Sequence, residues 1–161
     1  MTQVDSATQG VTLAEAPVLL FLVGGKQFAV DLARVQHILE YQVPTRTPCR
    51  PPYVEGIIQH KGRYLPVVSL RKRLGVNGTG PGNPAILLLT GIGQDSVVGL
   101  MVDQVVRVVS LPTDKVVPPP PRVFGIRAEF IRGVANAGGR PVVWLEETKL
   151  LTSAEPITLL V

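Results

Sequence analysis

The sequence predicts a mainly β protein built from two small β-barrels that pack against each other. Three observations support this prediction: short apolar runs recur at regular spacing, 16 Gly and 15 Pro punctuate them, and one motif occurs twice. Gly and Pro at this frequency leave little room for long helices, and short strands separated by turns are typical of barrels and sandwiches. Two similar units in tandem favour a pair of barrels.

The repeated motif defines the two units. The first copy comprises residues 53–57 (YVEGI), then Gly62-Arg63, then PVVSL; the second comprises residues 130–134 (FIRGV), then Gly139-Arg140, then PVVWL, with two residues deleted after its Arg. A weaker echo upstream pairs Ala-Val-Asp ending at Asp31 with Met-Val-Asp ending at Asp103.

These repeats set the expected domain boundaries. We place one domain at residues 17–152, with a first unit at about 18–76 and a second at about 84–152. Residues 1–16 are expected to form a flexible tail, because they contain no apolar run, and residues 153–161 to form a C-terminal extension.

The first unit opens with a predicted hairpin, in which the apolar runs 18–23 and 27–30 flank Gly24-Gly25. Asp31 suits a helix N-cap, and apolar residues recur at helical spacing from Leu32 to Leu39, which predicts a short amphipathic helix.

The unit closes with a strap, a hairpin and one helical turn. Four prolines between residues 44 and 52 require an extended strap. The apolar segments 56–58 and 64–70 flank Lys61-Gly62, which predicts a second hairpin, and residues 71–74 can form a single helical turn.

The second unit repeats this order. Residues 85–90 and 96–102 predict the opening hairpin, and 105–109 a further β segment. A polyproline strap at 118–121 precedes a closing hairpin formed by 130–134 and 141–145. The remaining predicted elements are a helical piece at 146–151 and a terminal strand at 157–161.

Composition argues against several classes of function. The formal net charge of +4 is dispersed, residues 71–73 being the only compact basic run, and 4 Phe, 3 Tyr and 1 Trp offer few stacking platforms, so we expect no nucleic-acid binding. We also expect no catalysis, no cofactor and no metal site, because the chain lacks a Gly-x-Ser-x-Gly elbow, a phosphate-binding loop and paired metal ligands.

The cellular location follows from what the sequence lacks. Cys49 is alone and cannot form an internal disulfide, which favours a reducing compartment. The N-terminus does not resemble a secretory signal, and no apolar segment reaches the ~20 residues of a spanning helix. We therefore expect a cytoplasmic protein with no direct membrane insertion.

The order and spacing of three segments resemble the CheW-like domain of bacterial chemotaxis coupling proteins. They are residues 56–70 (GIIQHKGRYLPVVSL), residues 28–30 with Val35 and Ile38, and residues 98–103 with Val105; the resemblance covers about residues 18–151. It implies two five-stranded SH3-like β-barrels around a shared apolar core, with short helices and no catalytic activity.

The resemblance also implies a function. Family members are adaptors that couple the cytoplasmic helical tip of chemoreceptors to a chemotaxis histidine kinase, which carries a CheW-like domain of its own. Pairing with itself or with another CheW-like protein, and recruitment to membrane-associated receptor arrays, are further implications. The physics fits this role, because an amphipathic helix is bound by a hydrophobic groove such as the seam between two barrels, and barrel ends offer apolar patches to the kinase.

This chain departs from the family pattern in its first half. Members commonly carry Asn-Leu-Arg-Gly where this chain has Gln59-His60-Lys61-Gly62, often Glu at the position of His37, and usually Asp at that of Ser69. Arg offers a planar fork where Lys offers a point charge, so a partner contact is altered. The alternative function is therefore a divergent CheW-like protein that binds receptors or another CheW-like domain without engaging a kinase.

The candidate partner-binding residues follow from the motif and its echo. Lys61 is the first choice, because hairpin tips often carry function, the alternative being an exposed charge without a role. Other interpretations make Val35 and Ile38 core residues, Gly56, Gly62, Gly133 and Gly139 turn or close-approach residues, and Asp31 and Asp103 local caps. The full set is Val35, His37, Ile38, His60, Lys61, Gly62, Val102 and Asp103.

Overall fold

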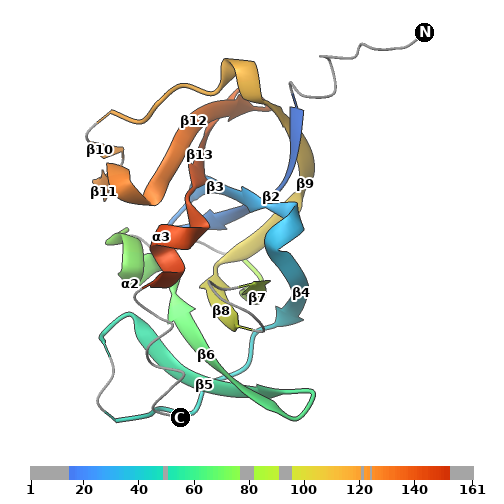
Figure 1. The fold of residues 1–161 in the computed structure, drawn as a ribbon, viewed down its shortest axis with the longest axis vertical. Coiled ribbons are helices and arrows are strands. Elements are labelled where there is room, and N and C mark those ends of the chain that lie inside the picture. The colour runs from blue at the N-terminus through green and yellow to red at the C-terminus, as the bar shows by residue number, and fades with distance from the viewer. Residues whose placement is uncertain are drawn as a thin grey trace, which may run out of the picture.

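Two five-stranded sheets, stacked one above the other, make up this computed structural model (Figure 1). The structure describes residues 15–48, 51–76, 82–90, 96–120, 122–123 and 125–152. The first sheet has the order β12 (Ile131–Ala137), β13 (Arg140–Leu145), β3 (Lys26–Asp31), β2 (Glu15–Val23) and β9 (Gln104–Pro112). The second has the order β4 (Val35–Glu40), β7 (Ala85–Thr90), β8 (Val97–Val102), β6 (Arg63–Ser69) and β5 (Val54–His60).

The remaining elements are short. A small ribbon joins β10 (Arg122–Val123) to β11 (Ile126–Arg127). The helical pieces are η1 (Leu32–Arg34), α2 (Leu70–Leu74), η2 (Thr113–Lys115), η3 (Ala128–Phe130) and α3 (Glu147–Thr152). The predicted mainly β class with short helices is confirmed. The helices among the described residues are too short and too polar to cross a membrane.

The two sheets exchange their opening hairpins. β3 pairs in parallel with β13, with Phe28 opposite Val143, and β8 pairs in parallel with β6, with Gly99 opposite Val67. Each sheet therefore combines the opening hairpin of one sequence unit with three later strands of the other. The tandem repeat suggested one barrel per unit, and the pairing shows instead that neither unit forms a sheet alone. The unit boundaries at about 76 and 84 stay a prediction.

Alternating side chains on the central strands build three layers of apolar core. On β2, Val18 and Leu20 point into the interior of the first sheet, whereas Leu19 and Phe21 point into a core between the sheets. On β7, Ile86 and Leu88 fill the second interior, and the residues that alternate with them join the shared core: Ala85, Leu87 and Leu89. Burial on both faces explains why these strands are continuous apolar runs in the sequence.

Gly56 and Gly133 lie in equivalent surroundings, as the repeat predicted. A Cβ atom on Gly56 would lie 2.2 Å from the carbonyl oxygen of Thr45. One on Gly133 would lie 2.9 Å from the carbonyl oxygen of Val117 and 2.3 Å from a methyl group of Val116. In each half a strap crosses the sheet edge here, forming an isolated bridge between Thr45 and Ile57 in one and between Val117 and Val134 in the other. Close approach of backbone therefore excludes a side chain at both glycines.

The predicted amphipathic helix after Asp31 is wrong. Only residues 32–34 form a 3-10 turn, and residues 35–40 form β4, an edge strand that pairs with β7. The pairing satisfies the backbone groups of β7, and a bulge between Val35 and His37 shifts the side-chain alternation so that apolar residues recur at a helix-like spacing.

The expectations for the two ends of the chain are tested only in part. Residues 15 and 16 belong to β2, so the predicted tail of residues 1–16 is too long by these two, and the rest of it lies outside the described residues. The predicted terminal strand at 157–161 and the extension at 153–161 also lie outside them.

Candidate interaction site

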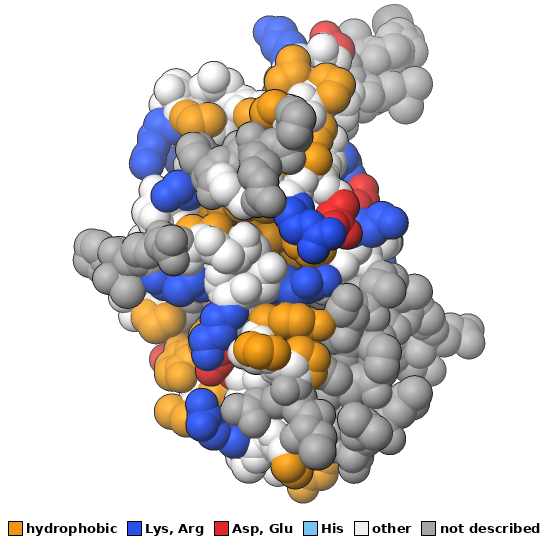
Figure 2. All heavy atoms as spheres, turned by 90° about the vertical axis from the view of Figure 1, so that its left-hand side faces the viewer, with side chains coloured by type: hydrophobic (Ala, Val, Ile, Leu, Met, Phe, Trp, Pro, Cys, Tyr) orange, Lys and Arg blue, Asp and Glu red, His pale blue; other side chains and the backbone are white. Residues whose placement is uncertain are grey.

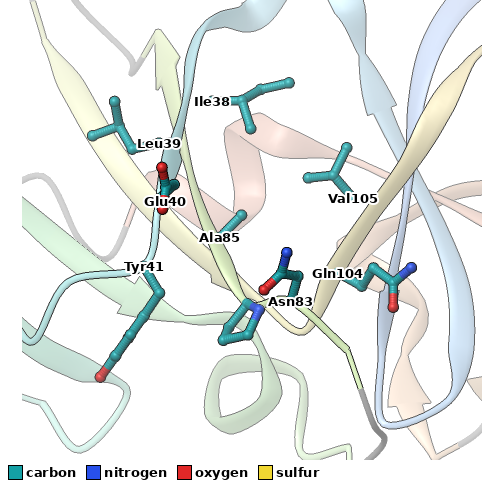
Figure 3. A pocket seen from close by; sticks show the side chains of 9 residues that line it. Ile38, Leu39, Glu40, Tyr41, Asn83, Ala85, Gln104 and Val105 are labelled. Carbon is teal, nitrogen blue, oxygen red and sulfur yellow. The ribbon is translucent and has the colours of Figure 1, made fainter.

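A groove of about 490 Å³ lies where the two sheets meet. In Figure 3, the end of β4 with Ile38 to Tyr41 forms one wall, Gln104 and Val105 at the start of β9 form the other, and Asn83 and Ala85 lie between them. We call this surface the seam groove; its lining residues are Ile38, Leu39, Glu40, Tyr41, Asn83, Pro84, Ala85, Gln104 and Val105. It occupies the position where the sequence analysis expected one.

The seam groove offers apolar side chains to solvent. Ile38 is 49% exposed and Tyr41 42% exposed, large values for residues of their size. Ile38 lies on β4, an edge strand whose outer side has no partner strand among the described elements, and Tyr41 directly follows β4. An exposed apolar surface rimmed by polar groups, here Glu40, Asn83 and Gln104, is typical of a protein-binding groove.

A second surface is formed by the β5–β6 hairpin tip. Its two-residue turn, Lys61-Gly62, has positive φ at both positions, 51° and 78°, the combination of a type I′ turn. Lys61 is the only non-glycine residue with positive φ in the described chain, at an order-of-magnitude cost of ~1 kcal/mol. Both turn residues are exposed, and Tyr64, 61% exposed, stands beside them on β6.

The structure brings together two positions at which this chain departs from the family pattern. The rings of His37 on β4 and His60 on β5 have centroids 5.2 Å apart and planes inclined at 59°. β4 and β5 are the opposite edge strands of the second sheet. The contact therefore closes the sheet on itself at this end.

Two of the predicted partner-binding residues have internal roles. Val102 is only 1% exposed and belongs to the shared core, so its predicted surface contact is wrong. The carboxylate of Asp103 accepts hydrogen bonds from Arg71 Nη2 at 2.6 Å and from the Gly24 amide at 2.8 Å. These bonds fix α2 and the β2–β3 turn. Val35 is partly buried against the shared core, which matches its core interpretation.

Asp31 occupies the place in the first sheet that Asp103 has in the second. It does not cap η1 through its side chain; its carboxylate accepts hydrogen bonds from Arg132 Nη1 at 2.8 Å and from Trp144 Nε1 at 2.9 Å. Both aspartates thus join elements distant in sequence, and the predicted local cap is wrong for Asp31.

Arg132 forms ion pairs with three carboxylates, one of them buried: Asp31, Glu146 and Glu147. We call these four residues the Arg132 cluster. Glu147, whose side chain is fully buried, accepts a hydrogen bond from the Asp31 amide at 2.7 Å, and burial raises its pKa. Burial also opposes ionisation of Glu146, but hydrogen bonds from Arg132 and Thr148 outweigh it and lower the Glu146 pKa. None of these four residues lines the seam groove. We therefore interpret the two pKa shifts as properties of a structural network and not of a binding site.

Ser69, another departure from the family pattern, also has a structural role. It is 2% exposed, and its hydroxyl accepts a hydrogen bond from the Lys72 amide at 3.3 Å as the N-cap of α2. Ser and Asp are both good N-cap residues, so Ser69 can serve as the cap at this position.

Several groove residues were not predicted from the sequence. Tyr41 lies in a loop without a motif, and Asn83 and Gln104 belong to separate segments that only the tertiary structure brings together. Among the described residues no group of three or more His, Cys, Asp or Glu side chains could hold a metal ion. On the face shown in Figure 2, Lys and Arg side chains lie in separate groups between hydrophobic ones.

A family model, the CheW-like domain, matches residues 17–155. This chain belongs to the CheW-like domain family. The match spans both sheets, so the two-sheet body as a whole is the family's domain, with its two SH3-like barrels.

Individual relatives agree. Chemotaxis protein CheW of Klebsiella aerogenes is 28% identical over 137 residues, which cover 85% of this chain and 82% of that protein. Protein FrzA of Myxococcus xanthus is 29% identical over 153 residues, covering 93% and 94%. The crystal structure of the scaffolding protein TtCheW from Thermoanaerobacter tengcongensis superposes with a TM-score of 0.77 at 26% identity, covering 84% of this chain and 86% of that one. This chain is thus similar, over most of its length, to proteins that are named as chemotaxis or scaffolding proteins.

Proposed function

We propose that this protein is a non-catalytic adaptor that couples the cytoplasmic helical tip of chemoreceptors to a chemotaxis histidine kinase. The single observation that carries the proposal is the seam groove, a partly apolar trough between the two barrels of a CheW-like domain. Relatives named as chemotaxis and scaffolding proteins support it. Such an adaptor acts in the cytoplasm, at membrane-associated receptor arrays.

The receptor contact is proposed for the seam groove. An amphipathic helix presents apolar side chains along one face, and the exposed Ile38 and Tyr41 with the partly buried Val105 offer them a complementary surface in the groove. The polar side chains at its rim, Glu40, Asn83 and Gln104, can bond the polar flanks of the helix. Val35 lies on the same strand and packs against the shared core.

The kinase contact is proposed for the β5–β6 hairpin tip. His60, Lys61 and Gly62 project from the end of the second sheet, and the exposed ring of Tyr64 supplies apolar area next to them. A CheW-like domain of the kinase, or of a second adaptor, has the same kind of barrel. One end of that barrel can bind the hairpin tip of this protein. His37, in contact with His60, belongs to the same surface.

Such an adaptor regulates a kinase without chemistry of its own. It needs only a contact whose free energy differs between receptor states, which a stiff β body transmits to the second contact. β4 reaches both surfaces, because Ile38 lines the seam groove and His37 lines the small hollow beside the hairpin tip. We propose β4 as the link between them.

Binding of a purified receptor tip fragment tests the receptor contact. Ile38→Glu places a charge in the seam groove and should weaken receptor binding about tenfold or more, equivalent to ~1.4 kcal/mol. Val117→Glu is the matched control, since Val117 is 56% exposed and lies on the strap of the other sheet. It should bind as the unmodified protein does. Equal binding by all three proteins would contradict the groove as the receptor site.

The kinase contact is tested by a pull-down with the purified kinase, in parallel with the receptor tip. Binding of both partners supports the adaptor. Receptor binding without kinase binding supports the alternative, a divergent CheW-like protein, which the departures at Lys61 and His37 favour. Kinase binding with no receptor binding contradicts both.

A further inference from the structure

A small hollow of about 100 Å³ lies where β4 meets the β5–β6 hairpin. Its rim carries four basic side chains, His37, His60, Lys61 and Arg63, and its apolar floor includes Leu65 and Leu88. No Asp or Glu is among the described residues that line it. We call it the basic hollow. The charged side chains among its described lining residues, Lys61 and Arg63, are both positive, although the whole chain carries 12 Asp and Glu against 16 Lys and Arg.

The His60 imidazole has a ring nitrogen without a hydrogen-bond partner among the described residues. This atom, Nε2, is buried. Buried polar atoms are normally paired, so an unpaired ring nitrogen beside a hollow points to a ligand that pairs with it. The His37 ring, 5.2 Å away, borders the same space.

The internal duplication provides a comparison for Lys61. In the second unit the equivalent turn of the β12–β13 hairpin is Gly138-Gly139, with φ of 61° and 77°. Its flanking residues are Ala137 and Arg140, where the first hairpin has His60 and Arg63. The first hairpin thus holds a lysine in a backbone conformation that its counterpart assigns to glycine. Both copies have positive φ at this turn position, and only the first places there a side chain that disfavours it, which indicates a role for the Lys61 side chain.

We propose that the basic hollow binds a carboxylate, the side chain of an Asp or Glu on a protein partner. The ammonium group of Lys61 supplies charge, and the imidazole N–H groups supply directed donors, a combination suited to charge-assisted hydrogen bonds with carboxylate oxygens. The inference rests on the proposed function, in which a protein partner contacts the hairpin tip. It adds that the partner residue bound there is acidic.

A transition-metal ion fits the hollow less well. The two imidazoles are its only His, Cys, Asp or Glu side chains among the described residues, and a stable site needs three or four such ligands. Lys61 and Arg63 also place positive charge beside any bound cation. These charges favour an anion.

NMR provides a selective test, because His37 and His60 are the only two histidines of the chain. With any histidine tag removed, the imidazole C–H resonances report on the basic hollow alone. We expect both to shift saturably on titration with a blocked tetraglutamate peptide at fixed pH and ionic strength. A tetraglutamine peptide and added NaCl should produce no saturable shift. Equal responses to the two peptides would overturn the proposal.

Variants separate the hollow from general charge attraction. Lys61→Gly should weaken peptide binding about fivefold or more while thermal stability is retained, because glycine suits the turn, and Lys61→Arg should keep binding within about twofold. Arg140→Gln, which removes one charge at the other hairpin, is the matched control and should leave binding unchanged. Equal weakening by Lys61→Gly and Arg140→Gln would overturn the proposal, as would saturation by micromolar Zn²⁺ with no response to tetraglutamate.

Receptor and kinase are absent from this titration. A negative result therefore removes the carboxylate site and leaves the adaptor proposal intact, whereas failure of receptor and kinase binding leaves the peptide result standing.

Discussion

The carbonyl oxygen of Thr45 lies so close to Gly56 that a Cβ atom on Gly56 would be 2.2 Å from it. Thr45 and Ile57 exchange two backbone hydrogen bonds of 2.8 Å, so the strap cannot move away without losing both. The strap thereby covers the outer edge of β5, which would otherwise present unpaired backbone groups. Val117 and Val134 repeat the arrangement at 3.0 and 2.9 Å in the other sheet.

Gly56→Ala should lower the free energy of unfolding by about 3 kcal/mol, because the new methyl group meets backbone and Gly56 has φ of +151°. Urea denaturation measures the loss. Gly62→Ala is the control, since Gly62 also has positive φ, +78°, but a Cβ atom there would meet no other atom within 4 Å; its cost should be about 1 kcal/mol. Equal losses would show that backbone conformation alone, and not the strap, requires glycine.

Arg132→Ala should destabilise the protein by about 2 kcal/mol. Its guanidinium contacts Asp31 and the fully buried Glu147, at 2.8 and 3.2 Å, and its removal leaves Glu147 without a cation. Arg127→Ala is a matched control, because Arg127 pairs with Glu129 at an exposed site and should contribute less than ~1 kcal/mol. Chemical denaturation of both variants gives the comparison. A loss at Arg127 as large as that at Arg132 would contradict the role of burial.

Glu147→Gln should change the pH dependence of stability. Burial raises the pKa of Glu147 above its ordinary value of 4.5, so the unfolded chain releases this proton at lower pH than the folded one. The contribution of Glu147 to stability is therefore fully present below pH 4.5 and falls as pH rises through the folded pKa. The stability of Glu147→Gln relative to the unmodified protein should rise over that window, as measured by urea unfolding at a series of pH values.

Glu146→Gln should show the opposite trend. The Glu146 pKa is lowered, so its contribution is present above 4.5 and is lost as pH falls through the folded pKa. The cost of this substitution should shrink on acidification below 4.5. Parallel pH profiles for the two variants would contradict the assigned environments.

Arg73→Lys should weaken the junction between the two halves by about 1 kcal/mol. The Arg73 guanidinium lies between the rings of Tyr53 and Phe130, with Cζ 4.6 and 4.5 Å from their centroids, and it reaches carbonyl oxygens of α3. Figure 1 shows α2 beside α3 at this junction. A lysine ammonium group keeps the positive charge, but it lacks the planar guanidinium that stacks on the two rings. Lys72→Arg, at a half-exposed neighbour, should leave the midpoint of thermal unfolding unchanged.

Much of the fold was predictable from local pattern. The repeat indicated both closing hairpins, and the Gly and Pro signals indicated the straps; the equivalent crowding at Gly56 and Gly133 confirms the duplication. The site was less predictable. The place of Lys61 at a hairpin turn was predictable because such a turn has a sequence signature, and its role in binding stays a prediction. The seam groove combines segments around residues 38–41, 83–85 and 104–105 that share no signature.

What the sequence determined by itself is most of the central strands, the hairpin turns and the crowded glycines, because apolar runs, φ preferences and proline geometry act within a few residues. Tertiary structure alone decided that the opening hairpins are exchanged through the β3–β13 and β6–β8 pairs, that residues 35–40 extend as a strand, and that His37 meets His60. Parallel pairing joins strands far apart in the chain, and its backbone hydrogen bonds carry no side-chain signature. The choice among partners therefore rests on which assembly buries all three cores at once.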